Sequence, residues 1–328
     1  MRRREFIALF GGTAIAWPLA AQAQRLAVPV IGYLGGQSAS LLATRVRAFH
    51  QGLEETGFVE GRNVAVQYRW ADGQYDRLPE MAADLVRRQV VVIAATGGVA
   101  PARAAKAATT IIPIVFEMGI DPVQAGLVAS WKQPGGNLTG VTSLNVTVGP
   151  KRVELMRELV PGASVVALLI NPTNQAIAES NLRDGQTAAR NLGLQIDALN
   201  ASNERELDNA FTTLAQKRIG ALVIGPDSFF TSQSEQLAKL ALRHAIPTIY
   251  YGREFTAAGG LISYGGSVAE SHRQTGAYTG RILKGDKISD LPVQQITKVE
   301  LIINLTTAKA LGITVAAALL ARADEVIE

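Results

Sequence analysis

Short apolar runs rich in β-branched residues alternate along the chain with patterns of helical periodicity. The apolar runs of a first set lie at 28–34, 63–70, 90–96, 112–118 and 138–144. Helices are predicted between them at 39–56, 75–89, 100–108 and 123–132. This alternation is typical of a parallel sheet whose strands are connected by crossover helices.

The same pattern then starts again. A helix at 150–160 leads into apolar runs at 164–172, 194–202, 221–230 and 247–252, separated by helices at 176–192, 204–217 and 232–244. There follow a run at 261–266, a helix at 268–283, a loop at 283–292, a strand at 300–305 and a short final helix. This last part is too small for a third domain, so it is predicted to complete both units.

The fold class predicted from this pattern is α/β, with two similar open lobes of mainly parallel sheet joined by a multi-strand hinge. The first lobe is expected to hold 24–142 plus 256–288, and the second 143–255 plus 289–328. Chain crossings are expected near 141–145, 251–255 and 290–295. Such crossings let two lobes rotate as rigid bodies.

Composition narrows the possible chemistry. Hydrophobic residues make up 48% of the chain and charged residues 18%, which excludes a disordered protein. There is no cysteine, which excludes disulfides, thiolate nucleophiles and cysteine-bound metal or iron–sulfur centres. With three histidines, a histidine-rich metal site is not expected either. No cofactor is predicted.

Residues 1–23 have the form of a signal peptide. An arginine-rich start precedes an apolar stretch that is too short and too interrupted to span a membrane, and Ala21-Gln22-Ala23 is a small-x-small end where cleavage is expected. The pair Arg3-Arg4 leaves a twin-arginine signal and a general secretory signal both open. The mature chain is therefore expected to be a soluble periplasmic protein.

Net charge gives little support for a nucleic-acid partner. The formal charge is +4, but without residues 2–5 the chain keeps 29 basic and 27 acidic residues, an excess of +2. No basic run occurs elsewhere in the sequence. Because nucleic-acid binding needs a basic footprint, no nucleic-acid partner is expected.

Ligands of open parallel sheets bind beyond the carboxyl ends of the strands, where polar and glycine-rich segments stand in both predicted lobes. If the lobes face each other, these segments enclose one cleft. The residues expected to contact a small ligand there are Gln37, Ser38, Trp70, Thr96, Gly97, Gly98, Asp121, Asn171, Asp227, Phe229, Tyr250, Glu254 and Tyr264.

Two of these positions are predicted to bind the oppositely charged ends of a ligand. The segment 96–98 ends a strand and opens a helix, so its backbone N–H groups could hold a ligand carboxylate, or the glycines could only allow close packing. Asp227 is predicted to pair with a ligand ammonium, because a helix beginning near Ser232 would start too late for Asp227 to cap it. Asp227→Ala is then expected to weaken binding and barely alter folding.

The other candidates keep alternative interpretations. Asp121 before Pro122 fits a helix N-cap better than a ligand contact. Glu254 could bind the ligand or pair with Arg253, and Asn171 could bridge the cleft or shape its turn. The aromatic rings could stack on an apolar ligand or pack in the hinge and core; they are Trp70, Phe229, Tyr250 and Tyr264.

The sequence contains no catalytic motif that would indicate an enzyme. The histidines at 50, 244 and 272 fit structural roles. None of them has a partner serine in an elbow of the G-x-S-x-G type. The cleft carboxylates stand in different loops, with nothing to set the separation that a glycosidase-like pair needs. No enzymatic activity is predicted.

Several segments, taken together and in order, resemble one known family. They are RRREFI, FVEGRNVAVQYRWADGQYDRLPEMAADLV, VIAATGG, DPVQAGLVASWKQPGGNLTGVT, LINPTN, IPTIYYGREF, GGLISYG, GRILKGDK, LPVQQ and KVELIINLTTAKALGI. They are similar to periplasmic substrate-binding proteins of ABC transporters, in the branch whose members bind tryptophan, tyrosine and phenylalanine. The resemblance covers essentially the whole chain.

This resemblance implies a type I periplasmic-binding-protein fold that closes on a small ligand and delivers it to a permease in the inner membrane. The implied ligand is an amino acid, aromatic ones included, or a related carboxylate, and a monomer is expected. Family members often place Thr-Pro after the 96–98 type of loop, whereas this chain has Val99-Ala100-Pro101 and so lacks that hydroxyl. The alternatives are a ligand-sensing subunit for a receptor or kinase, and an exported α/β enzyme.

For an amino-acid ligand the expected pose holds both charged ends. Asp227 would pair with the ammonium, the 96–98 helix start would hold the carboxylate, and the side chain would lie against Trp70 or Tyr250. Neither charge of the zwitterion would then be buried without a partner.

Overall fold

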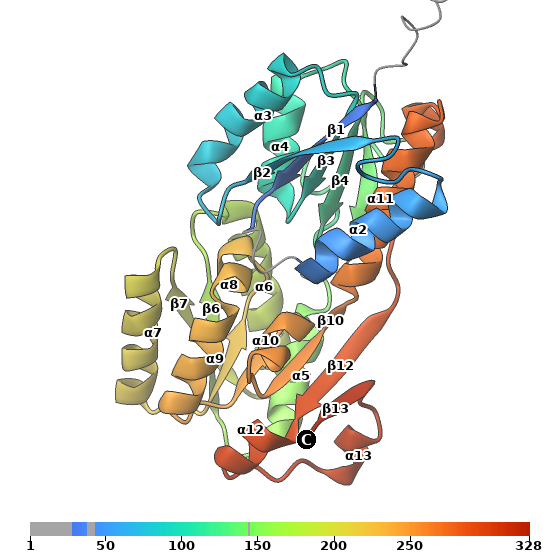
Figure 1. Cartoon of the computed structure of the whole chain (residues 1–328). Coiled ribbons are helices and arrows are strands. Elements are labelled where there is room, and N and C mark those ends of the chain that lie inside the picture. Colours follow the sequence, from blue (N-terminus) through green and yellow to red (C-terminus); the bar gives the residue numbers. More distant parts are fainter. Residues whose placement is uncertain (1–27, 38–42, 144) are drawn as a thin grey trace, which may run out of the picture.

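Two mainly parallel β-sheets organise the molecule, each covered by helices (Figure 1). The computed structural model describes residues 28–37, 43–143 and 145–328. The expected signal peptide at 1–23 and the candidate Ser38 lie outside these described residues. Nowhere in the described ranges is a helix both long enough and apolar enough to cross a membrane. The predicted fold class, α/β with two lobes of mainly parallel sheet, is confirmed.

The first lobe is built on a parallel sheet with the spatial order β11 (Gln294–Gln295), β5 (Leu138–Thr142), β4 (Ile114–Met118), β3 (Val92–Thr96), β1 (Val30–Gly35) and β2 (Ala65–Trp70). Its helices are α2 (Ala43–Glu55), α3 (Leu78–Arg87), α4 (Val99–Ala108) and α11 (Val268–Leu283). Successive strand residues point to opposite faces, so Ile93 packs toward α3 and α4 while Val92 and Ala94 pack toward α2 and α11. Burial on both faces explains why the inner strands β1, β3 and β4 are almost wholly apolar.

The second lobe is built on a sheet with the order β13 (Glu325–Ile327), β12 (Val299–Asn304), β10 (Ile262–Gly266), β9 (Thr248–Tyr250), β8 (Ala221–Ile224), β6 (Val165–Ile170) and β7 (Gln195–Asn200). Among the strand pairs of the described chain, only the pair of β10 and β12 is antiparallel. The helices are α5 (Gly149–Leu159), α6 (Gln175–Asn191), α7 (Glu204–Lys217), α8 (Ser228–Ser232), α9 (Ser234–Arg243), α10 (Arg253–Ala257), α12 (Leu305–Ala310) and α13 (Ala317–Leu320). The core again has two layers, since Leu168 packs toward α5 and α6 and Leu169 toward α7 and α9.

Two parts of the expected lobe boundaries are wrong. Strand β10 was expected in the first lobe, but it is hydrogen-bonded between β9 and β12 in the second sheet. Strand β11 was expected in the second lobe, but it pairs with β5 in the first sheet. The chain therefore returns to the first lobe after Gly266, not at 251–255. An apolar pattern marks a strand, whereas the sheet that it joins depends on pairing partners far along the chain.

The helix predicted at 123–132 is also wrong. Residues 122–126 form turns, and Gly126 with a φ of 70° ends them. The Asp121 carboxylate accepts the N–H groups of Val123 and Gln124 at 2.7 and 3.2 Å. Asp121 therefore caps its turn, as one interpretation of the sequence expected, but no helix follows.

Glycines allow α2 and α11 to pack backbone against backbone. A Cβ atom on Gly52 would lie 1.8 Å from the carbonyl oxygen of Arg273, and one on Gly276 would lie 2.0 Å from the carbonyl oxygen of Phe49. The two helices can approach this closely only because both positions lack a side chain. This helix pair covers one face of the first sheet, and α2 carries Arg45 across to the second lobe.

A buried arginine braces the crossings between the lobes. Arg152 of α5 is 1% exposed, and its guanidinium donates to the carbonyl oxygens of Asn145 at 2.8 Å and Tyr264 at 3.1 Å. The side-chain oxygen of Asn145 accepts the N–H of Gly266 at 2.8 Å. Burial lowers the pKa of Arg152 to about 10, so the group stays cationic at neutral pH. These bonds tie the crossing after β5 to the end of β10.

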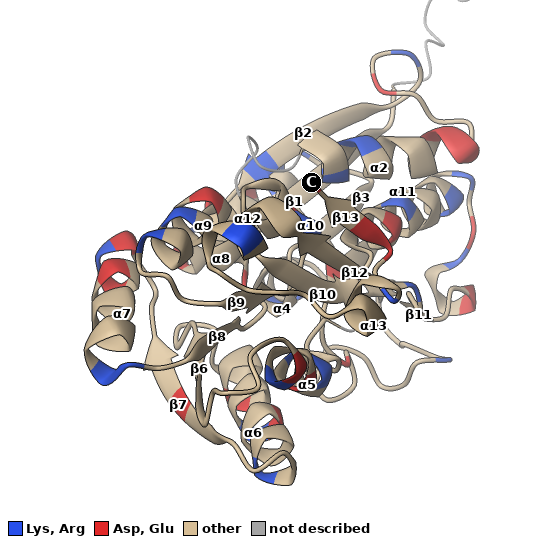
Figure 2. Cartoon of the chain, turned by 90° about the horizontal axis from the view of Figure 1, so that it is seen from below, with Lys and Arg blue, Asp and Glu red and all other residues tan. Residues whose placement is uncertain are grey.

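Charged side chains of both signs lie on the outer helices. Figure 2 shows blue and red segments on α5, α7 and α9, whereas strands β8, β9 and β10 are tan. This distribution is what two solvated lobes with apolar sheets require. The informative charges are therefore the few that lie between the lobes.

Candidate functional site

Loops at the carboxyl ends of strands from both lobes meet at one small space. This space, here called the inner cleft, has a volume of about 50 Å³. Its lining includes Gln37, Gly97, Gly98 and Glu117 of the first lobe, Asp227 and Ser228 of the second, and Asn145 of a crossing. The inner cleft is thus formed by segments that lie far apart in the sequence.

Asp227 is the most extensively hydrogen-bonded carboxylate of the inner cleft. One oxygen accepts the amide of Asn171 and the N–H of Phe229, both at 2.9 Å. The other accepts the hydroxyl of Tyr75 at 2.8 Å and the amide of Asn174 at 2.9 Å. Burial raises the pKa of Asp227, and the four donors oppose that rise. Both oxygens therefore have their usual complement of hydrogen bonds.

The same residue is the N-cap of α8, which begins at Ser228 and not near Ser232. The argument from sequence against a capping role for Asp227 is therefore wrong. Asp227 is also 7% exposed, so it does not face water, and its removal is now expected to lower stability.

Glu117 is a second buried carboxylate, from the middle of an apolar strand, that sequence analysis did not select. It is 4% exposed and lines the inner cleft from β4. One oxygen accepts the N–H of Gly97 at 3.2 Å, and the other accepts the hydroxyl of Ser271 at 3.1 Å. The N–H of Gly98 donates to the backbone oxygen of Glu117 at 3.2 Å. Both glycine amides that were predicted to hold a ligand carboxylate thus bond to Glu117.

An ion pair joins the lobes beside the inner cleft. The guanidinium of Arg45 donates through Nε and one terminal nitrogen to Glu254 Oε1, and through the other to Gln37 Oε1 at 2.7 Å. Burial lowers the pKa of Arg45, but the charge and hydrogen bond of Glu254, together with the nearby charge of Glu117, raise it overall. Burial raises the pKa of Glu254, but the charge of Arg45 and the hydrogen bonds from Arg45 and a backbone N–H lower it overall. Arg253, the alternative partner, pairs instead with Glu325.

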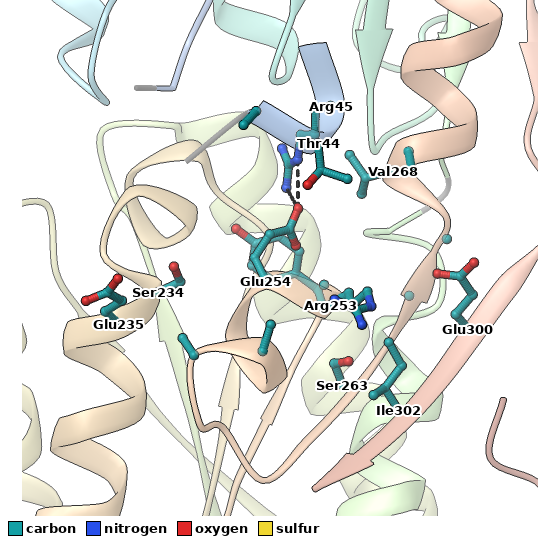
Figure 3. A pocket seen from close by; sticks show the side chains of 18 residues that line it. Thr44, Arg45, Ser234, Glu235, Arg253, Glu254, Ser263, Val268, Glu300 and Ile302 are labelled. Atoms are coloured by element: carbon teal, nitrogen blue, oxygen red, sulfur yellow. Dashed lines mark hydrogen bonds and ion pairs between the residues drawn. The ribbon is translucent and has the colours of Figure 1, made fainter. Parts of the chain in front are cut away.

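A larger space adjoins this ion pair. The outer cavity, as it is called below, has a volume of about 390 Å³ and shares Arg45, Tyr251 and Val268 with the lining of the inner cleft. Figure 3 shows Arg45 from α2 and Glu254 from α10 pointing toward each other. Ser234 lies on one side of the view and Glu300 on the other. The two spaces therefore lie next to each other.

The two lobes touch directly across the cleft. The hydroxyl of Ser228 donates to the carbonyl oxygen of Gly97 at 2.5 Å, and Tyr75 of the first lobe reaches Asp227 of the second. Together with the pair of Arg45 and Glu254, these contacts hold the lobes in a closed arrangement. The φ angles of 89° at Gly97 and 117° at Gly98 also explain why glycine occupies both positions.

The aromatic candidates do not line either cavity among the described residues. Trp70 lies over Gly35 and stacks on Tyr68, Tyr250 stacks on Phe255 in the core, and Phe229 is buried in the same core. Tyr264 packs against the core of the second lobe. These rings belong to apolar clusters because burial of their area outweighs contact with a wet cleft.

The remaining candidates have mixed positions. Gln37, Gly97, Gly98 and Asp227 line the inner cleft, and Glu254 lines the outer cavity. Thr96 is buried at the end of β3, and Asn171 is buried behind Asp227, to which it donates. Asp121 lies in its turn and is not among the residues that line the two cavities.

Sequence reasoning missed Arg45, Glu117 and Tyr75. Arg45 stands in a helix with an ordinary mixture of charges, and Tyr75 opens a helical segment, so neither carries a local signal. Glu117 does carry one, because a carboxylate inside the apolar run IVFEM must be buried with the strand.

Residues 29–327 match the family of ABC transporter substrate-binding proteins. The chain therefore belongs to this family of extracytoplasmic binding proteins, and the resemblance noted from its sequence is confirmed. Its fold is that of the type I periplasmic binding proteins.

Relatives agree with this assignment. The chain is 29% identical over 267 residues to the tyrosine-binding protein of Clostridioides difficile strain R20291, covering 81% of this chain and 75% of that protein. A structure of a conserved domain protein from Vibrio cholerae is 27% identical with a TM-score of 0.84, covering 91% of this chain and 99% of that one.

Two further structures share the fold. An ABC domain from Streptococcus pneumonia in complex with L-Trp has a TM-score of 0.82 at 23% identity, covering 91% of this chain and 99% of that one. The ligand-free, open structure of a substrate-binding protein with adhesive properties from Clostridium difficile has a TM-score of 0.64 at 24% identity, covering 92% and 99%.

Proposed function

We propose that this chain is the solute-binding component of an ABC importer and captures a small solute with an amino group between its lobes. The observation that carries the proposal is that Glu117 of one lobe and Asp227 of the other line the same inner cleft. A solute held there contacts both lobes, so its binding favours the closed arrangement. The tyrosine-binding relative and the L-Trp complex make amino acids and related amines the first solutes to test.

The implied partner is the membrane permease of the same transporter, to which a monomeric binding protein delivers its solute. Recognition of the closed form by the permease would couple capture to transport, because the relative position of the lobes changes when the ligand leaves. The lower TM-score with the ligand-free, open structure than with the L-Trp complex supports a hinged closure in this fold.

Closure can be measured in solution. A thermal-shift screen of amino acids, amines and other small solutes first selects a binder, since a ligand at 100 times its dissociation constant stabilises by about 2.7 kcal/mol. Small-angle scattering is then expected to show a smaller radius of gyration at saturation than without ligand. An unchanged radius of gyration at saturation would count against a closing two-lobe receptor.

Export is the second part of the proposal. The Ala21-Gln22-Ala23 end is the motif on which it rests, with Gln24 as the first residue of the mature chain. Mass spectrometry of protein recovered from the periplasm of a native-like host is expected to give the mass of residues 24–328. Periplasmic protein that retains residues before Ala23 would contradict this cleavage site.

A further inference from the structure

The start of helix α4 is where a ligand carboxylate would be expected, and Glu117 already occupies part of it. The N–H of Gly97 donates to the Glu117 side chain at 3.2 Å, and the N–H of Gly98 to its backbone oxygen at 3.2 Å. Pro101, in the first turn, has no N–H to offer. A ligand carboxylate placed here would lie beside the Glu117 carboxylate, and like charges at this distance repel.

The inner cleft also has an excess of negative charge. Neither Glu117 nor Asp227 has an ion-pair partner among the described residues. Arg45 is the one cation that lines the inner cleft in the described chain, and it is engaged by Glu254 and Gln37. Nearby His272 is fully buried, and burial lowers its pKa, so it supplies no positive charge at neutral pH. A cation bound in the closed cleft would balance this negative charge.

The two carboxylates differ in what they can still accept. Each oxygen of Asp227 already receives two hydrogen bonds from the chain. Each oxygen of Glu117 receives one, from Gly97 and from Ser271, and a carboxylate has about four acceptor positions. Glu117 is therefore the carboxylate with room for the N–H groups of a ligand, and Asp227 adds charge from the opposite lobe.

The volumes agree with a small cationic head. The inner cleft of about 50 Å³ has room for only a few water-sized groups, at roughly 10–15 Å³ for each. An ammonium on a short chain fits such a space, and the outer cavity of about 390 Å³ lies next to it.

We propose that the ligand is an organic amine without an α-carboxylate. Glu117 selects this amine, because it occupies the place at the start of α4 where a ligand carboxylate would bind. This inference rests on the proposed function and narrows the solute class for the same cleft. Glu117 is then a specificity-determining residue that accepts hydrogen bonds from the ligand ammonium.

Pairs of compounds that differ only in the carboxylate test this directly. Calorimetric titration of the mature protein would compare tyramine with L-tyrosine, phenethylamine with L-phenylalanine, tryptamine with L-tryptophan, putrescine with L-ornithine, and agmatine with L-arginine. In at least one pair the amine is expected to bind at least about tenfold more tightly, because its partner places a second carboxylate beside Glu117.

Glu117→Gln tests whether Glu117 causes this preference for the amine, because the substitution keeps the shape of the side chain and removes its charge. It is expected to weaken the preferred amine at least about tenfold and to reduce the preference over the matched amino acid. The control is Glu154→Gln, the same chemical change on the exposed face of α5, which is expected to leave both affinities unchanged. Melting of each unliganded variant shows whether the fold is intact.

The outcomes separate this inference from the proposed function. Tighter binding of the amino acid in every pair that binds overturns the inference and leaves the capture of a small solute standing. An amine that binds Glu117→Gln as tightly as the unaltered protein overturns the role of Glu117. If none of the amines binds, the inference is overturned, while the proposed function is decided separately by the wider solute screen and the scattering experiment.

Discussion

Asp227→Ala is expected to lower the affinity for the captured solute at least about thirtyfold and the free energy of unfolding by about 3 kcal/mol. The loss of binding follows from removing a buried charge that faces the ligand from the second lobe. The loss of stability follows because the amides of Asn171 and Asn174 and the hydroxyl of Tyr75 lose their acceptor. The cap of α8 is lost as well, which alone costs about 1 kcal/mol.

Calorimetric titration and urea unfolding followed by circular dichroism measure the two effects on one protein preparation. Asp208→Ala, the same substitution on the exposed face of α7, is the matched control and is expected to change stability by less than about 0.5 kcal/mol. Asp227→Asn keeps the shape but not the charge, so it is expected to lose less stability than Asp227→Ala. A stable Asp227→Ala protein with affinity reduced less than threefold would remove Asp227 from the binding site.

Gly52→Ala is expected to reduce the free energy of unfolding by about 2 kcal/mol, although alanine is the better helix former. The added Cβ would lie 1.8 Å from the carbonyl oxygen of Arg273, so α2 and α11 must move apart. Such overpacking costs up to about 3 kcal/mol, which exceeds the gain of about 1 kcal/mol from helix propensity. Solute affinity is expected to fall too, because α2 carries Arg45.

Urea unfolding of Gly52→Ala beside Gly162→Ala gives the comparison. A Cβ on Gly162 meets no atom within 4 Å, so that variant is expected to be neutral or slightly more stable. If both variants are as stable as the unaltered protein, the two helices do not pack backbone against backbone in solution.

Much of the fold could be predicted from the sequence because strand and helix patterns are local. The apolar runs at 90–96, 112–118 and 221–230 contain β3, β4 and β8, and the predicted helix at 268–283 is α11. Each run is apolar because its strand is buried on both faces, and that requirement is written in consecutive residues. The glycines at 97 and 98 likewise marked a strand end beside the cleft.

The sheet to which β10 and β11 belong could not be predicted in the same way. Both are short strands near crossings, and the sequence pattern is equally compatible with either lobe. The pairing of β10 with β12 and of β11 with β5 decides which sheet each strand joins. These contacts join segments with no shared sequence pattern. The predicted helix at 123–132 failed for a related reason, since a capping residue signals a turn but not how far a helix continues.

The sequence by itself determined the alternation of strands and helices, the two-lobed α/β class and the glycine-lined loops that approach the cleft. Only the tertiary structure decided which charges meet there. Arg45 and Glu254 are 209 residues apart, and Tyr75 and Asp227 are 152 residues apart. Periodicity reports which face of its own element a residue occupies, whereas an ion pair or a shared cavity depends on how distant elements pack. For the same reason the aromatic residues near strand ends joined the cores, and a glutamate within a buried strand came to line the cleft.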